Sequence, residues 1–185
     1  SAIMLAFRSF AWLFSLSALM SAAAAAPAPA REAVRAGAPI QSHARFCELM
    51  TRKLPNVTPA LCALAQLQPG PARSVQGHNL LTRDVVSPQA ALRVLVVGGV
   101  HGDELSSTAL VLHWIGAAQD EPANIHWRFV PLMNPDGMLK ARPTRTNANG
   151  VDLNRNFPTP KWDKEAPRYW QHRTSKDPRR FPGHQ

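Results

Sequence analysis

The sequence has few of the residues that mark several classes of protein. Only two of its 185 residues are cysteine, one is tyrosine, and 18% are charged. Two cysteines are too few for a structural zinc site, which uses about four closely spaced ligands. No run of Lys and Arg alternates with aromatic residues, so the diffuse formal net charge of +9 does not indicate a nucleic-acid partner. We therefore expect one main globular domain without nucleic acid.

The sequence also lacks an apolar run long enough for a comfortable membrane span, which takes about 20 residues. The longest candidate, residues 10–20, follows Arg8 and precedes small residues through Ala26. This pattern is typical of a secretory signal peptide over residues 1–26, with an uncleaved anchor as the alternative. We expect a secreted or periplasmic bacterial protein that keeps no stable membrane insertion after signal cleavage.

Three further segments follow the predicted signal peptide. Residues 27–40 form an Ala/Pro-rich linker, because their composition cannot bury a core. Residues 41–90 form an N-terminal segment with a helical pattern near residues 44–53. In an oxidising compartment its two cysteines, Cys47 and Cys62, favour one disulfide over two free thiols. Residues 91–185 form the main folded segment.

The clearest structural pattern begins at Leu92. Residues 92–98 form a β-branched apolar run, residues 104–118 have helical periodicity, and residues 125–132 form a second apolar run. A strand, helix and strand with short connections predict a parallel crossover unit inside an α/β sheet.

His101 and Glu104 come directly after the first of these strands. Open α/β sheets bind ligands at this place, and an imidazole with a carboxylate is a common part of a catalytic zinc site. The adjacent glycines do not have the G-x-G-x-x-G spacing, and no P-loop lysine follows, which argues against a nucleotide loop. Taken alone, the pair is equally typical of a strand end followed by an acid in the first helical turn.

A second cluster of polar residues follows the second predicted strand. It contains Asn-Pro-Asp-Gly at residues 134–137 and Arg-Thr-Asn-Ala-Asn-Gly-Val-Asp-Leu-Asn-Arg-Asn-Phe-Pro at residues 145–158. Together with His-x-x-Glu at 101–104, and in this order, these segments resemble the zinc carboxypeptidase family. Within it they are most similar to bacterial murein peptide amidases.

The resemblance implies a fold, a cofactor and a set of site residues. The fold is α/β, a three-layer mixed sheet with helices on both faces, here truncated after the first strands. The cofactor is zinc. The resemblance implies that His101 and Glu104 are zinc ligands. It implies that Arg145, or as second candidate Arg142, polarises the scissile carbonyl. It further implies that Asn154 and Arg155 bind the substrate carboxylate. A guanidinium beside an amide suits that last role, because its planar fork of donors matches a carboxylate. Asp136 and Asp152 more readily cap turns and orient neighbours than catalyse.

The resemblance further implies hydrolysis of an amide bond near a free carboxylate, in peptides derived from peptidoglycan. Two alternatives stay open: a deacylase of N-acyl amino acids of the aspartoacylase type, and a non-catalytic basic fragment that binds cell wall. The family's third zinc ligand, a His, and its glutamate general base have no counterpart in the sequence. We therefore expect a gene fragment that is unstable or inactive alone, since two ligands hold zinc poorly.

Overall fold

The computed structural model describes residues 37–120 and 124–183. The predicted signal peptide and the linker up to residue 36 lie outside these described residues. All of the described residues belong to one compact unit. Within the described ranges, no helix combines the length and the apolar character that a membrane crossing requires.

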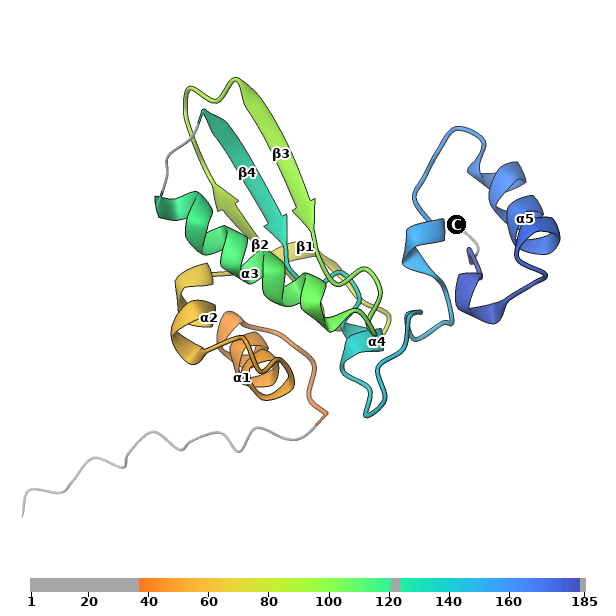
Figure 1. Ribbon diagram of the computed structural model, residues 1–185, viewed down its shortest axis with the longest axis horizontal. Coiled ribbons are helices and arrows are strands. Elements are labelled where there is room, and N and C mark those ends of the chain that lie inside the picture. Colours follow the sequence, from red (N-terminus) through yellow and green to blue (C-terminus); the bar gives the residue numbers. More distant parts are fainter. Residues whose placement is uncertain (1–36, 121–123, 184–185) are drawn as a thin grey trace, which may run out of the picture. The chain divides into compact units, whose positions relative to one another are not determined.

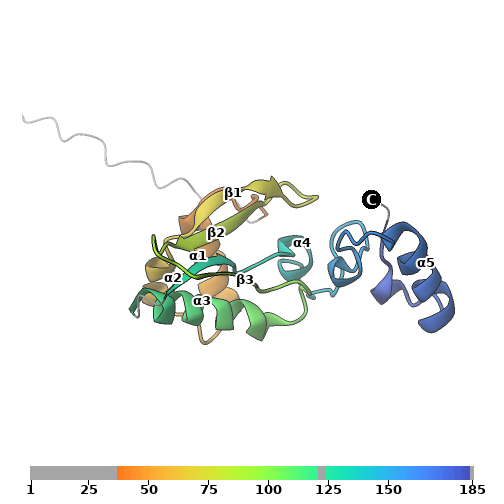
Figure 2. The same cartoon turned by 90° about the horizontal axis from the view of Figure 1, so that it is seen from above.

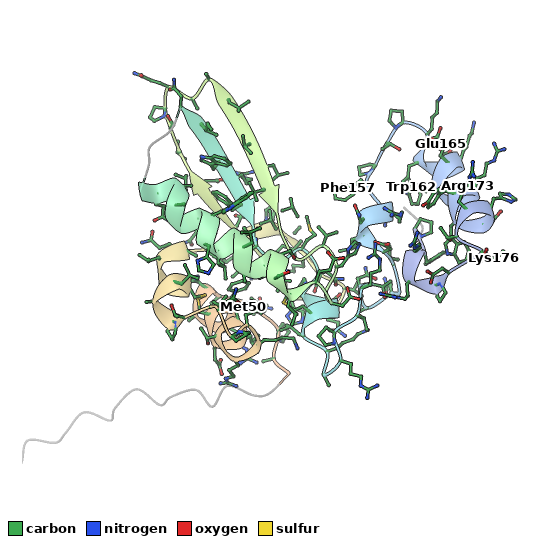
Figure 3. The ribbon with its side chains drawn as sticks, viewed as in Figure 1. Met50, Phe157, Trp162, Glu165, Arg173 and Lys176 are labelled. Atoms are coloured by element: carbon green, nitrogen blue, oxygen red, sulfur yellow. A yellow bond between two sulfur atoms is a disulfide. The ribbon has the colours of Figure 1, made fainter. Side chains whose placement is uncertain are left out.

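Two short helices open the described part of the chain. α1 (His43–Lys53) begins at Ser42, whose hydroxyl accepts a hydrogen bond from the Arg45 amide, and it confirms the predicted helix. α2 (Pro59–Ala65) starts with proline at its first position, where the missing N–H costs nothing. A disulfide between Cys47 and Cys62 joins the two helices. Met50 of α1 is fully buried in the core (Figure 3).

The sheet contains four strands: β1 (Gln68–Arg73), β2 (Asn79–Val85), β3 (Leu92–Val97) and β4 (Ile125–Val130). Their order is β1-β2-β4-β3, with β3 and β4 parallel and the other neighbouring pairs antiparallel. α3 (Leu105–Asp120) connects β3 to β4, so the predicted crossover unit is confirmed (Figure 1). The predicted α/β class with a mixed sheet is also confirmed.

β1 and β2 were not predicted from the sequence. β1 reads Gln-Pro-Gly-Pro-Ala-Arg, and its prolines are tolerated because it is an edge strand with few ladder hydrogen bonds to lose. β2 pairs with β4 through Arg83–Phe129, Asp84–Arg128 and Val85–Trp127. The predicted boundary at residue 90 therefore falls inside one sheet, since β2 lies before it and β4 after it.

One face of this sheet packs against helices, which lie beneath it in Figure 2. Phe129 and Leu81 on that face are buried with Leu112 and Ile115 of α3. On the opposite face Leu95 is 63% exposed, so at this point the described residues do not cover the sheet. The core thus lies between the sheet and the helices. It holds the parallel strands β3 and β4 in place, so that their carboxyl ends lie at the same edge of the sheet.

The remaining elements follow β4. They are α4 (Pro135–Met138), the 3-10 helix η1 (Leu153–Arg155), α5 (Trp162–Arg173) and the 3-10 helix η2 (Pro178–Arg180). No helix was expected after the second predicted strand, so α5 was missed. Pro167 lies inside that helix, where proline removes a backbone hydrogen bond, and this hid the helical pattern. Acidic Asp163 and Glu165 in the first turn are the signal that could have revealed it.

Candidate active site

The end of β3 places the candidate metal pair. The Gly98 amide donates to Val130 O at 2.8 Å, which continues the parallel ladder, and the Asn134 amide donates to Gly99 O at 2.8 Å. Gly99 has a φ of +57°, and a Cβ there would lie 2.6 Å from the Thr108 hydroxyl oxygen. Only glycine fits this turn, which directs the following residues over the end of the sheet.

His101 lies between two carboxylates. Its Nδ1 is 2.9 Å from Glu104 Oε1, and its Nε2 is 3.0 Å from Asp152 Oδ1. His101 and Asp152 are buried, whereas the Glu104 side chain is 57% exposed. If Nε2 carries the proton toward Asp152, Nδ1 and Glu104 Oε1 both present lone pairs to each other. In this tautomer the two atoms could together hold a cation.

Arg145 joins the same group of side chains. Its Nε donates to Asp152 Oδ2 at 3.1 Å, and its Nη1 is 3.6 Å from Glu104 Oε1. Asp152 therefore contacts His101 with one oxygen and Arg145 with the other. It also caps η1 by accepting from the Asn154 amide at 3.0 Å. The second arginine candidate, Arg142, is exposed.

α4 sets the distance between the His101 loop and the Arg145 loop. The Asn134 side chain accepts from the Gly137 amide at 2.8 Å and donates from Nδ2 to Arg145 O at 3.0 Å. A Cβ on Gly102 would lie 2.3 Å from Gly137 C, and a Cβ on Gly137 would lie 2.6 Å from Thr144 O. These backbones meet where no side chain fits, so the Asn-Pro-Asp-Gly segment works as a rigid spacer.

The first two candidate ligands fit one zinc ion. Two zinc bonds of ~2.0–2.2 Å can join donor atoms no more than ~4 Å apart, and His101 Nδ1 and Glu104 Oε1 are 2.9 Å apart. Histidine ligands commonly donate their other ring N–H to a carboxylate, which is the position of Asp152. Among the described residues, no group of three or more His, Cys, Asp or Glu side chains is arranged to hold a metal.

Arg155 lies elsewhere. Its guanidinium carbon is 5.9 Å from the centre of the Tyr169 ring, and its Nη1 donates to Asn154 O at 2.8 Å. It lines a cavity of about 480 Å³, and none of His101, Glu104 and Arg145 belongs to that lining. Arg145 instead lines a separate cavity of about 730 Å³ together with Asp103, Trp170 and Arg179. Asn154 itself is exposed. The structure thus brings together the predicted site residues His101, Glu104 and Arg145. It places Arg155 beside α5 instead.

Comparison with known proteins identifies the class. The zinc carboxypeptidase family model matches residues 58–182, so the chain belongs to the zinc carboxypeptidase family. The predicted family is confirmed.

Individual relatives include murein peptide amidase A of Escherichia coli K12, which is 41% identical over 68 residues covering 37% of this chain and 26% of the relative. The human carboxypeptidase N catalytic chain is 30% identical over 144 residues, which cover 63% of this chain and 31% of the relative. The chain therefore spans about a quarter to a third of the length of these two relatives.

Solved structures of the same kind are also similar. Murein-tripeptide amidase MpaA from E. coli O157 has a TM-score of 0.35 at 32% identity, over 49% of this chain and 36% of that one. Bovine thrombin-activatable fibrinolysis inhibitor, in complex with tick carboxypeptidase inhibitor, has a TM-score of 0.46 at 23% identity, over 66% and 43%.

Proposed function

We propose that this chain carries part of the active site of a zinc-dependent hydrolase that cleaves an amide bond near a free carboxylate, in peptides derived from peptidoglycan. The observation that carries the proposal is the bridge made by Asp152, which contacts His101 and Arg145 with its two oxygens. A candidate metal ligand and a cationic group thereby face the same space. The similarity to murein peptide amidase A supports the choice of substrate.

Each residue has a role that follows from its contacts. Zinc, when bound, supplies a Lewis acid. Asp152 accepts a hydrogen bond from His101 Nε2, so His101 Nδ1 and Glu104 Oε1 are the two atoms that would hold the ion. Arg145 keeps its Nε on Asp152 and its Nη1 near Glu104, and its outer N–H groups can donate to a carbonyl oxygen that becomes negative. Arg155 and Asn154 bind the substrate's carboxylate.

We also propose that the 185-residue chain is inactive by itself. Among the described residues, only His101 and Glu104 are placed to contact the ion, and a catalytic zinc site uses about three protein ligands. The purified chain with zinc should give no turnover of a murein tripeptide. Turnover that disappears with His101→Ala would overturn this part and leave the proposed chemistry intact.

A chimeric enzyme tests the function itself. Residues 92–158 of this chain, which contain the His101 and Arg145 loops, would replace their counterparts in E. coli murein peptide amidase A. The chimera should hydrolyse a murein tripeptide, and should lose this activity with His101→Ala or Glu104→Ala. Arg142→Ala, an exposed arginine beside the site, serves as the control and should retain activity. Hydrolysis of N-acetyl or N-succinyl amino acids alone would favour a deacylase instead, and no hydrolysis with retained sacculus binding would favour a wall-binding role.

We propose export from the cytoplasm as well. The disulfide between Cys47 and Cys62 supports this proposal, because such bonds persist in oxidising compartments. Fractionation of cells that express the chain should recover it outside the cytoplasm with the disulfide formed. Recovery of reduced protein from the cytoplasm would contradict the proposal.

A further inference from the structure

Three basic side chains lie along one face of α5. Lys161 precedes the helix as its N-cap residue, and Lys164 and Arg168 follow at spacings of three and four residues. Each residue of an α-helix turns by about 100°, so these spacings place all three on one face, over about 10 Å of its length. The three residues are exposed, and none of them forms an ion pair within the described part of the chain. We call them the cationic stripe.

The opposite face of α5 packs against its own surroundings. Trp162 is buried, and its Nε1 donates to Arg155 O at 2.8 Å (Figure 3). Trp170 Nε1 donates to Asp177 O at 2.7 Å, and the Trp170 and Phe181 rings meet edge to face at 5.1 Å. The aromatic side of the helix is therefore occupied within the protein, which leaves the cationic stripe on the outside.

The cationic stripe is locally unfavourable for the helix. Like charges three or four residues apart on a helix repel each other, and the positive end of the helix dipole disfavours lysine in the first turn. Glu165 is the acidic residue nearest to the stripe, four residues after Lys161, and it forms no ion pair within the described residues either. One carboxylate beside three cations leaves this face with an excess of positive charge. An anionic partner would remove the repulsion.

The structure favours one class of anionic partner. A line of charges suits a chain-like polymer, whereas a helix that lies in a lipid surface inserts an apolar face, and that face of α5 is already packed. Nucleic-acid binding uses free aromatic rings on which bases stack, but the exposed Tyr169 ring faces the Arg155 guanidinium at 5.9 Å. A polymer with repeated carboxylates needs neither an apolar face nor a stacking platform.

We propose that the cationic stripe of α5 is a docking surface for intact peptidoglycan, where it binds the carboxylates of neighbouring peptide stems. This inference rests on the proposed function, because it takes the polymer that contains the substrate as the partner. The stripe would hold the protein on the polymer through surface charge, apart from the candidate metal pair and from Arg155. The binding should therefore be weak for each charge, additive and sensitive to salt.

The test is cosedimentation of the whole 185-residue chain with purified sacculi at low ionic strength. The triple variant Lys161→Gln, Lys164→Gln, Arg168→Gln should bind roughly tenfold more weakly than the parent chain, and raised salt should remove most of this difference. The matched control neutralises three exposed cations elsewhere, Arg73→Gln, Arg93→Gln and Lys140→Gln, and should change binding less than about threefold. Thermal unfolding of the stripe variant should show no lower midpoint, because the removed charges repel each other.

Changes to the ligand test its chemistry. Sacculi whose carboxylates have been converted to amides should bind the parent chain about as weakly as untreated sacculi bind the stripe variant. Equal losses in the stripe and control variants, or full binding to amidated sacculi, would overturn the inference. Stripe-dependent binding to phosphatidylglycerol vesicles without binding to sacculi would overturn the choice of partner.

Two outcomes separate this inference from the proposed function. If Arg155→Gln abolished sacculus binding while the stripe variant bound like the parent chain, the docking surface would fall and the carboxylate role of Arg155 would be supported. If the stripe variant lost binding but the chimeric enzyme failed to hydrolyse a murein tripeptide, the docking surface would stand and the proposed chemistry would fall.

Discussion

Replacement of Asp152 by asparagine should destabilise the chain far more than its small change in shape suggests. Asp152 is fully buried and accepts from three donors: His101 Nε2 at 3.0 Å, the Asn154 amide at 3.0 Å and Arg145 Nε at 3.1 Å. An asparagine has only one acceptor oxygen, so its NH₂ must face either Arg145 or the other two donors. In both orientations donors oppose each other in a buried place.

The size of the effect follows from these contacts. A hydrogen bond to a charged group contributes about 1.5–3 kcal/mol, and breaking a fully buried ion pair costs about 3–5 kcal/mol. The Arg145 side chain is 19% exposed, so water compensates part of its loss. We expect Asp152→Asn to lower the free energy of unfolding by about 2–3 kcal/mol.

Urea unfolding in the presence of a chelator, followed by tryptophan fluorescence, measures this difference without a contribution from metal. Asp84→Asn is the matched control, because Asp84 pairs with the exposed Arg128 on the sheet surface. The same isosteric change there should cost much less, since water screens such pairs. Equal urea midpoints for the two variants would refute the reasoning that Asp152 organises the site.

Three further predictions concern stability. Replacing Cys47 and Cys62 by alanine should lower the free energy of unfolding by about 3 kcal/mol, because the disulfide closes a loop with a sequence separation of 15. In urea unfolding, the parent chain under reducing conditions should be as stable as this variant. Gly102→Ala should lower the thermal midpoint, because its Cβ would lie 2.3 Å from Gly137 C, whereas Gly116→Ala, with open space around it, should not. Burial lowers the pKa of His43 and of His78 below the ordinary value of 6.5. The unfolded chain then binds more protons, so the free energy of unfolding should fall between about pH 7.5 and pH 5 in urea titrations.

Controls separate these effects from general destabilisation. The pH dependence should become shallower in His43→Gln, and an unchanged slope would contradict burial as its cause. The hydrogen bond from Arg128 also lowers the pKa of Asp84, whose stabilising effect is lost only as pH falls below its ordinary value of 3.8. The titration of Asp84 therefore does not contribute to the change expected between about pH 7.5 and pH 5. Unchanged stability of the cysteine-free variant, or of Gly102→Ala, would count against the corresponding structural argument.

Local sequence was enough to predict several parts of this protein. The order β3, α3 and β4 follows from apolar runs and helical periodicity, because each pattern spans fewer than about 20 neighbouring residues. The pairing of His101 with Glu104 follows from a tight turn at a strand end. The family was evident from the signature at residues 145–158, and the match over residues 58–182 confirmed it.

Only the tertiary structure decided how these parts meet. His101 and Asp152 are 51 residues apart in sequence, and their contact depends on the close approach of Gly102 and Gly137 across α4. β2 joins the sheet through β4, 44 residues away at the Asp84–Arg128 pair. The placement of Arg155 beside α5, rather than beside the metal pair, likewise depends on packing around Trp162. The periodicity of apolar residues indicates which face of a helix or strand is buried. Which other segment packs against that face is decided by long-range hydrogen bonds and by close backbone packing.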